Sequence, residues 1–177
     1  SQLDVMYDYA NAAITDVAGF AECRQATSRA TEQSFEVAVA DLEGDAAPEI
    51  AVGMGPRSAA DGTTSELRIY QVGEVVKTQS TVNLPTNCDP PTTTISVPAI
   101  DAGFAMLTAR FDPAMAQAAL VYSAPSINTV YVRLPGTTDP MAITVPITGS
   151  TFGYALAAGD LDGDDVPELV IGAPKSD

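Results

Sequence analysis

The sequence predicts an all-β fold built from β-propeller blades, each of them a four-stranded antiparallel sheet. Three observations support this prediction: one acidic turn occurs twice at a spacing of two blades, short apolar runs flank each turn, and 13 Gly and 13 Pro separate the runs. With 46% hydrophobic residues, the 177-residue chain can also bury a core. A β-sandwich of similar strands is the alternative, but it does not explain why one turn recurs at this spacing.

The clearest repeat relates residues 40–53, ADLEGDAAPEIAVG, to residues 159–172, GDLDGDDVPELVIG. Their offset is 119 residues (160 − 41), so a third copy would lie midway, about 60 residues from each. Residues 103–125 match the repeat loosely, because they end in LVYSAP where the last copy has LVIGAP. In this middle copy PAMAQA replaces the acidic turn. We therefore expect three repeats, of which the middle one is degenerate.

Each repeat has the pattern of several short strands. Apolar runs lie before the turns at 35–40 and 152–158, and after them at 50–52 and 169–171. A third strand, at 66–72 and 129–134, alternates apolar with polar residues, as half-buried strands do. The candidate fourth strands are 75–82 and 141–147, and the composition of residues 83–94 predicts a loop.

These patterns divide the chain into four parts. Residues 1–33 are an N-terminal segment of uncertain structure, and residues 34–102 are a first blade with an acidic loop. Residues 103–150 are the degenerate second blade without such a loop, and residues 151–177 begin a third blade with an acidic loop. Because a propeller generally has at least four blades, we expect the chain to be part of a larger propeller or assembly, unless the N-terminal segment and a partner supply the missing strands.

The composition excludes several classes of function. Eight Lys and Arg against 23 Asp and Glu give a net charge of −15, which repels nucleic acid and disfavours an anionic membrane surface. The chain has no His, so Ser-His-Asp triads and His-ligated zinc are excluded, and we expect the chain by itself not to be an enzyme. It has no apolar run of transmembrane length, and its N-terminus lacks the pattern of a signal peptide.

The last acidic turn places carboxylates at alternate positions of a nine-residue loop. Asp160 is first, Asp162 third, Asp164 fifth and Glu168 ninth, and the carbonyl of Val166 stands at the seventh position. Such carboxylates repel one another unless a cation lies between them, and Ca²⁺ prefers carboxylate and carbonyl oxygens. We therefore predict a Ca²⁺ site. A Mg²⁺ site, a metal-free solvated turn and a catalytic pair of carboxylates are the alternatives.

The first acidic turn offers the same set of ligands with one change. They are Asp41, Glu43, Asp45, the carbonyl of Ala47, and Glu49. The third ligand position holds Glu instead of Asp, and the additional methylene group crowds a small site. We therefore expect this loop to bind Ca²⁺ more weakly than the last one.

The two cysteines, Cys23 and Cys88, do not form a CxxC motif. A disulfide between them would close a loop of about 66 residues and stabilise the fold by roughly 4 kcal/mol in the chain-entropy model. Both lie in polar surroundings that resemble loops, which favours a disulfide formed in an oxidising compartment. Two buried unpaired thiols are the alternative.

The last repeat resembles the FG-GAP repeat family, which forms the blades of the integrin α-subunit propeller. The resemblance is carried by Phe152-Gly153, the acidic turn, Pro167-Glu168-Leu169 and Gly172-Ala173-Pro174. In the first repeat Phe35-Glu36 stands where Phe-Gly is usual. The resemblance implies a propeller with Ca²⁺ in the loops of its blades. It extends the metal ligands to the two acidic loops only, so the region around Met115 is expected to be metal-free.

The resemblance implies that the protein acts outside the cell. We expect a non-catalytic, calcium-binding module, secreted or at the cell surface, that serves adhesion or recognises a protein or glycan. Its partners would be such a ligand, or further propeller blades or subunits. Two alternatives remain open: a structural subunit of a surface assembly or filament, and an accessory propeller domain of a larger secreted enzyme.

Overall fold

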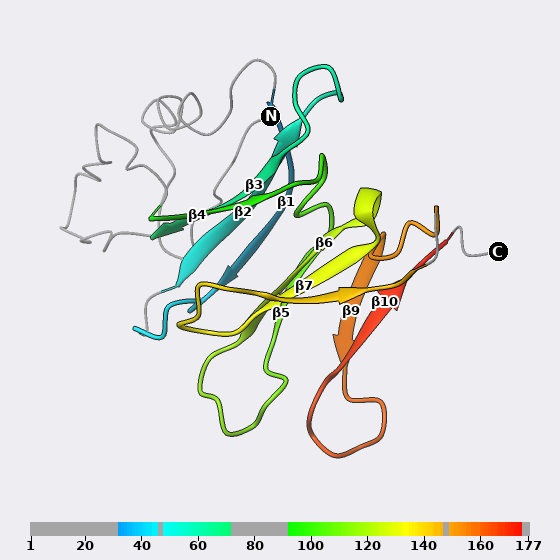
Figure 1. Cartoon of the computed structure of the whole chain (residues 1–177). Helices are drawn as coiled ribbons and strands as arrows, with labels where there is room; N and C mark the ends of the chain where they lie inside the picture. The colour runs from blue at the N-terminus through cyan, green and yellow to red at the C-terminus, as the bar shows by residue number, and fades with distance from the viewer. Residues whose placement is uncertain (1–31, 46–47, 72–91, 147–148, 175–177) are drawn as a thin grey trace, which may run out of the picture.

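The structure, a computed structural model, describes residues 32–45, 48–71, 92–146 and 149–174. In these ranges the chain forms ten β-strands and one short 3-10 helix. The strands make two four-stranded sheets and one two-stranded sheet, and every strand pair is antiparallel (Figure 1). The prediction of an all-β fold with four-stranded antiparallel units is thus confirmed.

The first sheet has the order β1-β2-β3-β4. Its strands are β1 (Glu32–Ala40), β2 (Glu49–Pro56), β3 (Ser65–Gln71) and β4 (Thr93–Val97). The sequence placed the fourth strand at residues 75–82, which lie outside the described residues, so that prediction stays untested; in the described part of the chain the fourth strand of this sheet is β4. The sequence of β4, TTISV, is as polar as that of a loop, but its β-branched side chains favour a strand. Two of them, Ile95 and Val97, pack into the core.

The second sheet has the order β5-β6-β7-β8. Its strands are β5 (Met106–Ala109), β6 (Ala119–Ala124), β7 (Thr129–Arg133) and β8 (Met141–Thr144), and the helix η1 (Pro125–Ile127) connects β6 to β7. Here the fourth strand begins at the residue that the sequence predicted. All six residues of β6 are buried, because both faces of this sheet are covered. A strand covered on both faces is a continuous apolar run, as the sequence of β6 is.

The third sheet pairs β9 (Ala155–Gly159) with β10 (Glu168–Gly172). The three sheets follow one another in space, with the second between the first and the third (Figure 1). One apolar core lies between the first and second sheets and includes Ala51 and Tyr122. Another lies between the second and third sheets and includes Val121 with Ile171.

In each sheet, the loop of the first hairpin begins and ends at equivalent residues. The last pairs before the three loops are Ala40 with Glu49, Ala109 with Ala119, and Gly159 with Glu168. Residues 40, 109 and 159 are therefore equivalent, with offsets of 69 (109 − 40) and 50 (159 − 109). In Figure 1 the loops after β5 and β9 project from the same end of their sheets.

Equivalent aromatic residues connect the sheets. The same offsets relate Phe35, Phe104 and Tyr154, so the structure aligns Phe35 with Tyr154 and not, as the sequence motif had suggested, with Phe152. The ring centroids of Phe35 and Phe104 are 6.3 Å apart, and those of Phe104 and Tyr154 are 5.0 Å apart. The rings thus form one line of contacts that runs through all three sheets.

Candidate metal centre

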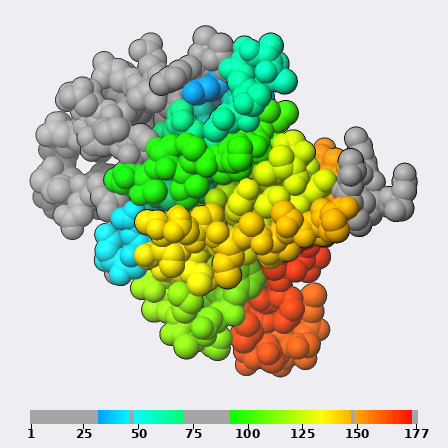
Figure 2. Space-filling view, viewed as in Figure 1, coloured from blue at the N-terminus to red at the C-terminus, as the bar shows by residue number. Residues whose placement is uncertain are grey.

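The last acidic loop lies between β9 and β10 and holds the carboxylates that the sequence predicted as ligands. Asp160 directly follows β9, and Glu168 is the first residue of β10. Gly163 and Asp165 take positive φ values of 85° and 66°, which bend the backbone back on itself. Glycine adopts this conformation without steric strain, and aspartate is among the residues that tolerate it. The loop projects at the lower edge of the molecule in Figure 2.

Asp160 organises this loop through backbone hydrogen bonds. Its Oδ1 accepts from the N–H of Gly163 at 2.7 Å and of Asp164 at 3.2 Å, and its Oδ2 accepts from that of Asp165 at 3.0 Å. These N–H donors, that of Gly163 first, lower the pKa of the Asp160 carboxyl below its ordinary value of 3.8. The side chain is therefore ionised at neutral pH.

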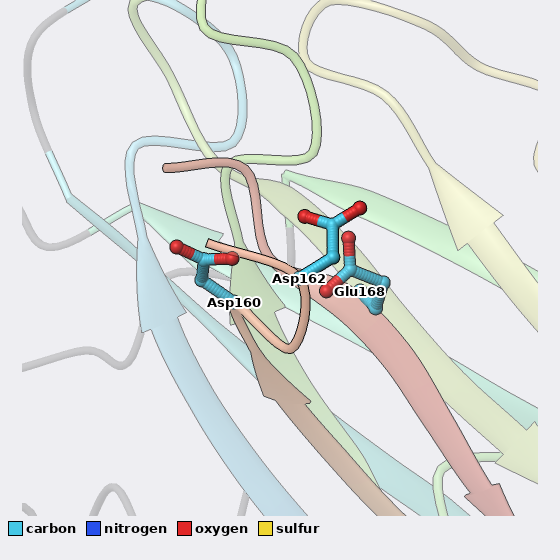
Figure 3. Close-up of side chains that lie close together, drawn as sticks. All are labelled: Asp160, Asp162 and Glu168. Atoms are coloured by element: carbon cyan, nitrogen blue, oxygen red, sulfur yellow. The ribbon is translucent and has the colours of Figure 1, made fainter. Parts of the chain in front are cut away.

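Three carboxylates come together at this point. One oxygen each from Asp160, Asp162 and Glu168 lie within 4.8 Å of one another (Figure 3). Glu168 is held in place because its Oε2 accepts from the N–H of Leu161 at 2.7 Å. Negative charges at this separation repel one another, and a divalent cation that binds all three oxygens relieves the repulsion.

The two other predicted ligands lie in the same loop. The Oδ1 of Asp164 accepts from the N–H of Val166 at 2.9 Å, so the side chain of Asp164 folds over the second half of the loop. The observations on Val166 concern its N–H and not its carbonyl. Its role as a ligand stays a prediction, as does that of Asp164.

The first acidic loop, between β1 and β2, repeats the hydrogen bonds of the last one. The Oδ1 of Asp41 accepts from the N–H of Gly44 at 2.6 Å, as Asp160 accepts from Gly163. The Oε2 of Glu49 accepts from the N–H of Leu42 at 2.7 Å, as Glu168 accepts from Leu161. Gly44 also has a positive φ, 83°. The sequence repeat is thus a repeat of backbone geometry.

Glu49 differs from Glu168 in its surroundings. Its side chain is fully buried, and its Oε1 has no hydrogen-bond partner among the described residues. Burial raises the pKa of its carboxyl above the ordinary 4.5, although the N–H groups of Leu42 and Glu43 act in the opposite direction; the nearby charges of Asp45 and Glu43 raise it further. A buried carboxylate oxygen without a partner is costly, and a cation would satisfy it.

The remaining ligands of the first loop are less well gathered. The Oε1 of Glu43 accepts a long hydrogen bond, 3.4 Å, from the hydroxyl of Thr93 on β4. Among the described residues, three acids with oxygens within 4.8 Å occur in the last loop and not in this one. Ala47 lies outside the described residues, and so do Cys23 and Cys88, so the expected carbonyl ligand and the expected disulfide stay predictions.

The middle loop, between β5 and β6, contains a feature that sequence reasoning missed. Arg110 directly follows β5 and so takes the place of Asp41 and Asp160, and Ala119 takes the place of Glu49 and Glu168. The signal was present in the sequence, since the residue after the first strand is acidic in the first and last repeats and basic in the middle one.

Of Tyr70, Tyr131 and Tyr154, two pack within the fold. Tyr131 stacks on Tyr122 with ring centroids 5.0 Å apart, and Tyr70 packs against the buried residues of β2. Tyr154 is 51% exposed, although one face of its ring contacts Phe104. Tyr154 is therefore the one of these three whose ring is open to a partner.

One of the three comparisons with known proteins matches the motif. A family model described as FG-GAP repeat matches residues 152–177, a stretch that contains the last acidic loop. The comparison with curated proteins and that with solved structures gave no match. In the part of the chain that the structure describes, no helix has the length and apolar character needed to cross a membrane.

Proposed function

We propose that this chain is a non-catalytic, calcium-binding module of the β-propeller type that works outside the cytoplasm, where it recognises a protein or glycan or mediates adhesion. The observation that carries the proposal is the last acidic loop, in which oxygens of three carboxylates lie within 4.8 Å of one another. The match of the same stretch to the FG-GAP repeat supports it too.

The residues that would hold the cation are those at alternate positions of the loop. Asp160, Asp162 and Glu168 would bind it directly, and Asp164 and the carbonyl of Val166 would complete the set. This set consists of oxygen donors only, which suits Ca²⁺, whereas Mg²⁺ takes fewer protein ligands in strict octahedral geometry. The bound ion would neutralise the loop and join the end of β9 to the start of β10.

The role of these carboxylates would be structural and not catalytic. In both loops their oxygens accept hydrogen bonds from the backbone of the same loop, as those of Asp41 and Asp160 do. A general acid or base needs a proton that it can exchange with a substrate, whereas these groups are engaged in shaping the turn. The occurrence of the arrangement in two loops also favours a structural role.

An extracellular location would suit a calcium site in an exposed loop. Asp160 and Asp162 are exposed to solvent, so the site would be an open one. Open sites in extracellular modules bind Ca²⁺ with dissociation constants of roughly 10⁻⁴–10⁻³ M, which suits the calcium concentration outside cells. A binding site of this kind would be filled there and empty in the cytosol.

The proposal is tested by calorimetric titration with Ca²⁺ and by thermal unfolding with Ca²⁺ or a chelator. Saturation at 100 times the dissociation constant is expected to add about 2.7 kcal/mol per site to the free energy of unfolding. Asp160→Asn is expected to remove one site, and the control Asp139→Asn, an exposed acid outside the loops, to remove none. Identical calorimetric traces for Asp160→Asn and the unsubstituted chain would contradict the proposal.

A second candidate, a structural subunit of an assembly, is favoured by the outer face of the third sheet. Ala51, Val121 and Val170 are equivalent, and each pairs with the matching residue of the preceding strand. Ala51 and Val121 are 0% exposed because they contact the next sheet, whereas Val170 is 45% exposed. A further sheet of the same kind would cover Val170.

Sedimentation at increasing concentrations tests the second candidate. Self-assembly through this face predicts an average mass that rises with concentration. Val170→Asp should suppress the rise, while the control Ile127→Asp, on the exposed helix η1, should not. A chain that stays monomeric at all concentrations would contradict this second candidate, and the calcium-binding module would be the candidate that remains.

A further inference from the structure

The middle loop contains a fixed positive charge where the other two loops gather negative ones. Because Ala109 pairs with Ala119 as Gly159 pairs with Glu168, Arg110 stands at the first ligand position. The last ligand position holds Ala119, which is 3% exposed and cannot bind a cation through its side chain. Both ends of the ligand set have therefore been replaced.

The direction of the hydrogen bonds is also reversed in this loop. In the acidic loops the first side chain accepts from backbone N–H groups, as Asp160 accepts from Gly163. In the middle loop the first side chain donates to backbone carbonyl groups. The Nε and Nη2 atoms of Arg110 donate to the carbonyl oxygen of Met115 at 3.0 and 2.7 Å, and Nη2 also approaches that of Pro113 at 3.4 Å.

The loop therefore directs carbonyl oxygens toward a cation, and the cation is part of the chain. Asp112 supports this conformation, because its Oδ1 accepts from the N–H of Ala114 at 2.8 Å and its backbone carbonyl from that of Met115 at 3.1 Å. Where the acidic loops have their last carboxylate, apolar side chains line a hollow around Ala119, among them Phe111 and Leu134.

We propose that the guanidinium of Arg110 is a built-in substitute for the metal ion, which holds the middle loop in its conformation at any calcium concentration. This rests on the proposed function only in that the two acidic loops are taken to need Ca²⁺. The module then has a central repeat that is indifferent to calcium, between two repeats that respond to it. Loss of calcium would loosen the first and last loops and leave the middle one intact.

Hydrogen exchange of the backbone amides, measured with Ca²⁺ and with a chelator, tests this proposal. In the unsubstituted chain the amides of residues 111, 112 and 114–117 are expected to exchange at the same rate in both buffers, and Pro113 has no N–H to measure. Arg110→Gln removes the charge and is expected to speed this exchange about tenfold in both buffers alike. Arg110→Lys, which keeps the charge with fewer donors, should give a smaller increase. Arg57→Gln is the matched control, because Arg57 is also exposed and donates to a backbone carbonyl, that of Glu32, outside these loops.

The outcomes separate this proposal from the proposed function. Unchanged exchange in Arg110→Gln, or exchange in the unsubstituted middle loop that slows with Ca²⁺, would overturn the role of Arg110. Exchange in residues 160–166 that is the same with and without Ca²⁺ would instead contradict the calcium site of the last loop. The comparison of Arg110→Gln with Arg57→Gln would still decide the role of Arg110.

Discussion

Glu49 and Glu168 occupy equivalent positions and bind equivalent N–H groups, but only Glu49 is fully buried. In a metal-free loop the buried carboxylate must either lose its charge or remain ionised without a partner for Oε1, and both cost free energy. Binding of a cation removes that cost. The stability of the first loop should therefore depend on the ion more through Glu49 than through any exposed ligand.

This argument predicts opposite effects of Glu49→Gln in two buffers. With a chelator, the free energy of unfolding should stay the same or rise by about 1 kcal/mol, because the amide removes a buried charge and can still accept from Leu42 N–H. With saturating Ca²⁺, about 2.7 kcal/mol of stabilisation should be lost. Urea unfolding in both buffers measures the two values. Strong destabilisation in the chelator would show that the carboxylate is satisfied without metal.

At the scale of elements, the sequence predicts strands best where burial makes the pattern unambiguous. β10 is a short apolar run that ends at a small residue, and it was predicted to within one residue at each end. The fourth strand of the first sheet was missed because β4 is rich in Thr and Ser, which are common in loops as well as in exposed strand positions. Polarity alone cannot separate those two environments.

The acidic loops were predictable for a related reason. Their ligands are local in sequence, so alternate spacing determines which side chains can meet, and Asp160, Asp162 and Glu168 do meet. The hydrogen bond from Thr93 to Glu43 was not predictable from the loop, because Thr93 lies on β4, 50 residues away in the chain. The burial of Glu49 was not predictable either, because it depends on how the folded chain packs around the loop. The loop sequence specifies the site, and the neighbouring sheet modifies it.

The two loops are expected to lose calcium at different pH. The pKa of Glu49 is raised, so this ligand takes up a proton at a higher pH, and its ionised form contributes stability only when a cation is bound. The pKa of Asp160 is lowered, so the stabilisation from its N–H bonds is fully present above its ordinary pKa and is lost only as pH falls through the lowered value. As pH falls, the first loop should release calcium before the last loop.

Calcium titration at a series of pH values from 7 downward measures this difference. We expect the first-loop site to be lost at a higher pH than the last-loop site. In Asp160→Asn, the matched variant, the one site that remains should be lost at the higher of these two pH values. Retention of the first-loop site after that of the last loop has gone would contradict the assignment of the two pKa shifts.

At the scale of the whole molecule, the contacts between sheets repeat as the strands do. Gly103 and Gly153 are equivalent, and each lies against the preceding sheet where a side chain would not fit. A Cβ on Gly103 would lie 2.5 Å from the Cα of Gly53, and one on Gly153 would lie 2.9 Å from the Cβ of Ser123. The aromatic contacts of Phe104 and Tyr154 follow directly in sequence. Each glycine thus allows the aromatic residue that follows it in sequence to contact the aromatic ring of the preceding repeat.

Gly103→Ala should therefore separate two sheets, and Gly149→Ala provides the control for backbone strain alone. Both glycines have positive φ, 83° and 76°, so both alanines carry a strain of about 1–2 kcal/mol. Only Gly103 faces backbone atoms at close range, since a Cβ on Gly149 would have nothing within 4 Å. Overpacking against a backbone that cannot move aside should add about 1–3 kcal/mol for Gly103→Ala. Urea unfolding of the two variants measures the difference, and equal losses would mean that the sheets can move apart without cost, so that the close glycine contact does not hold the repeats together.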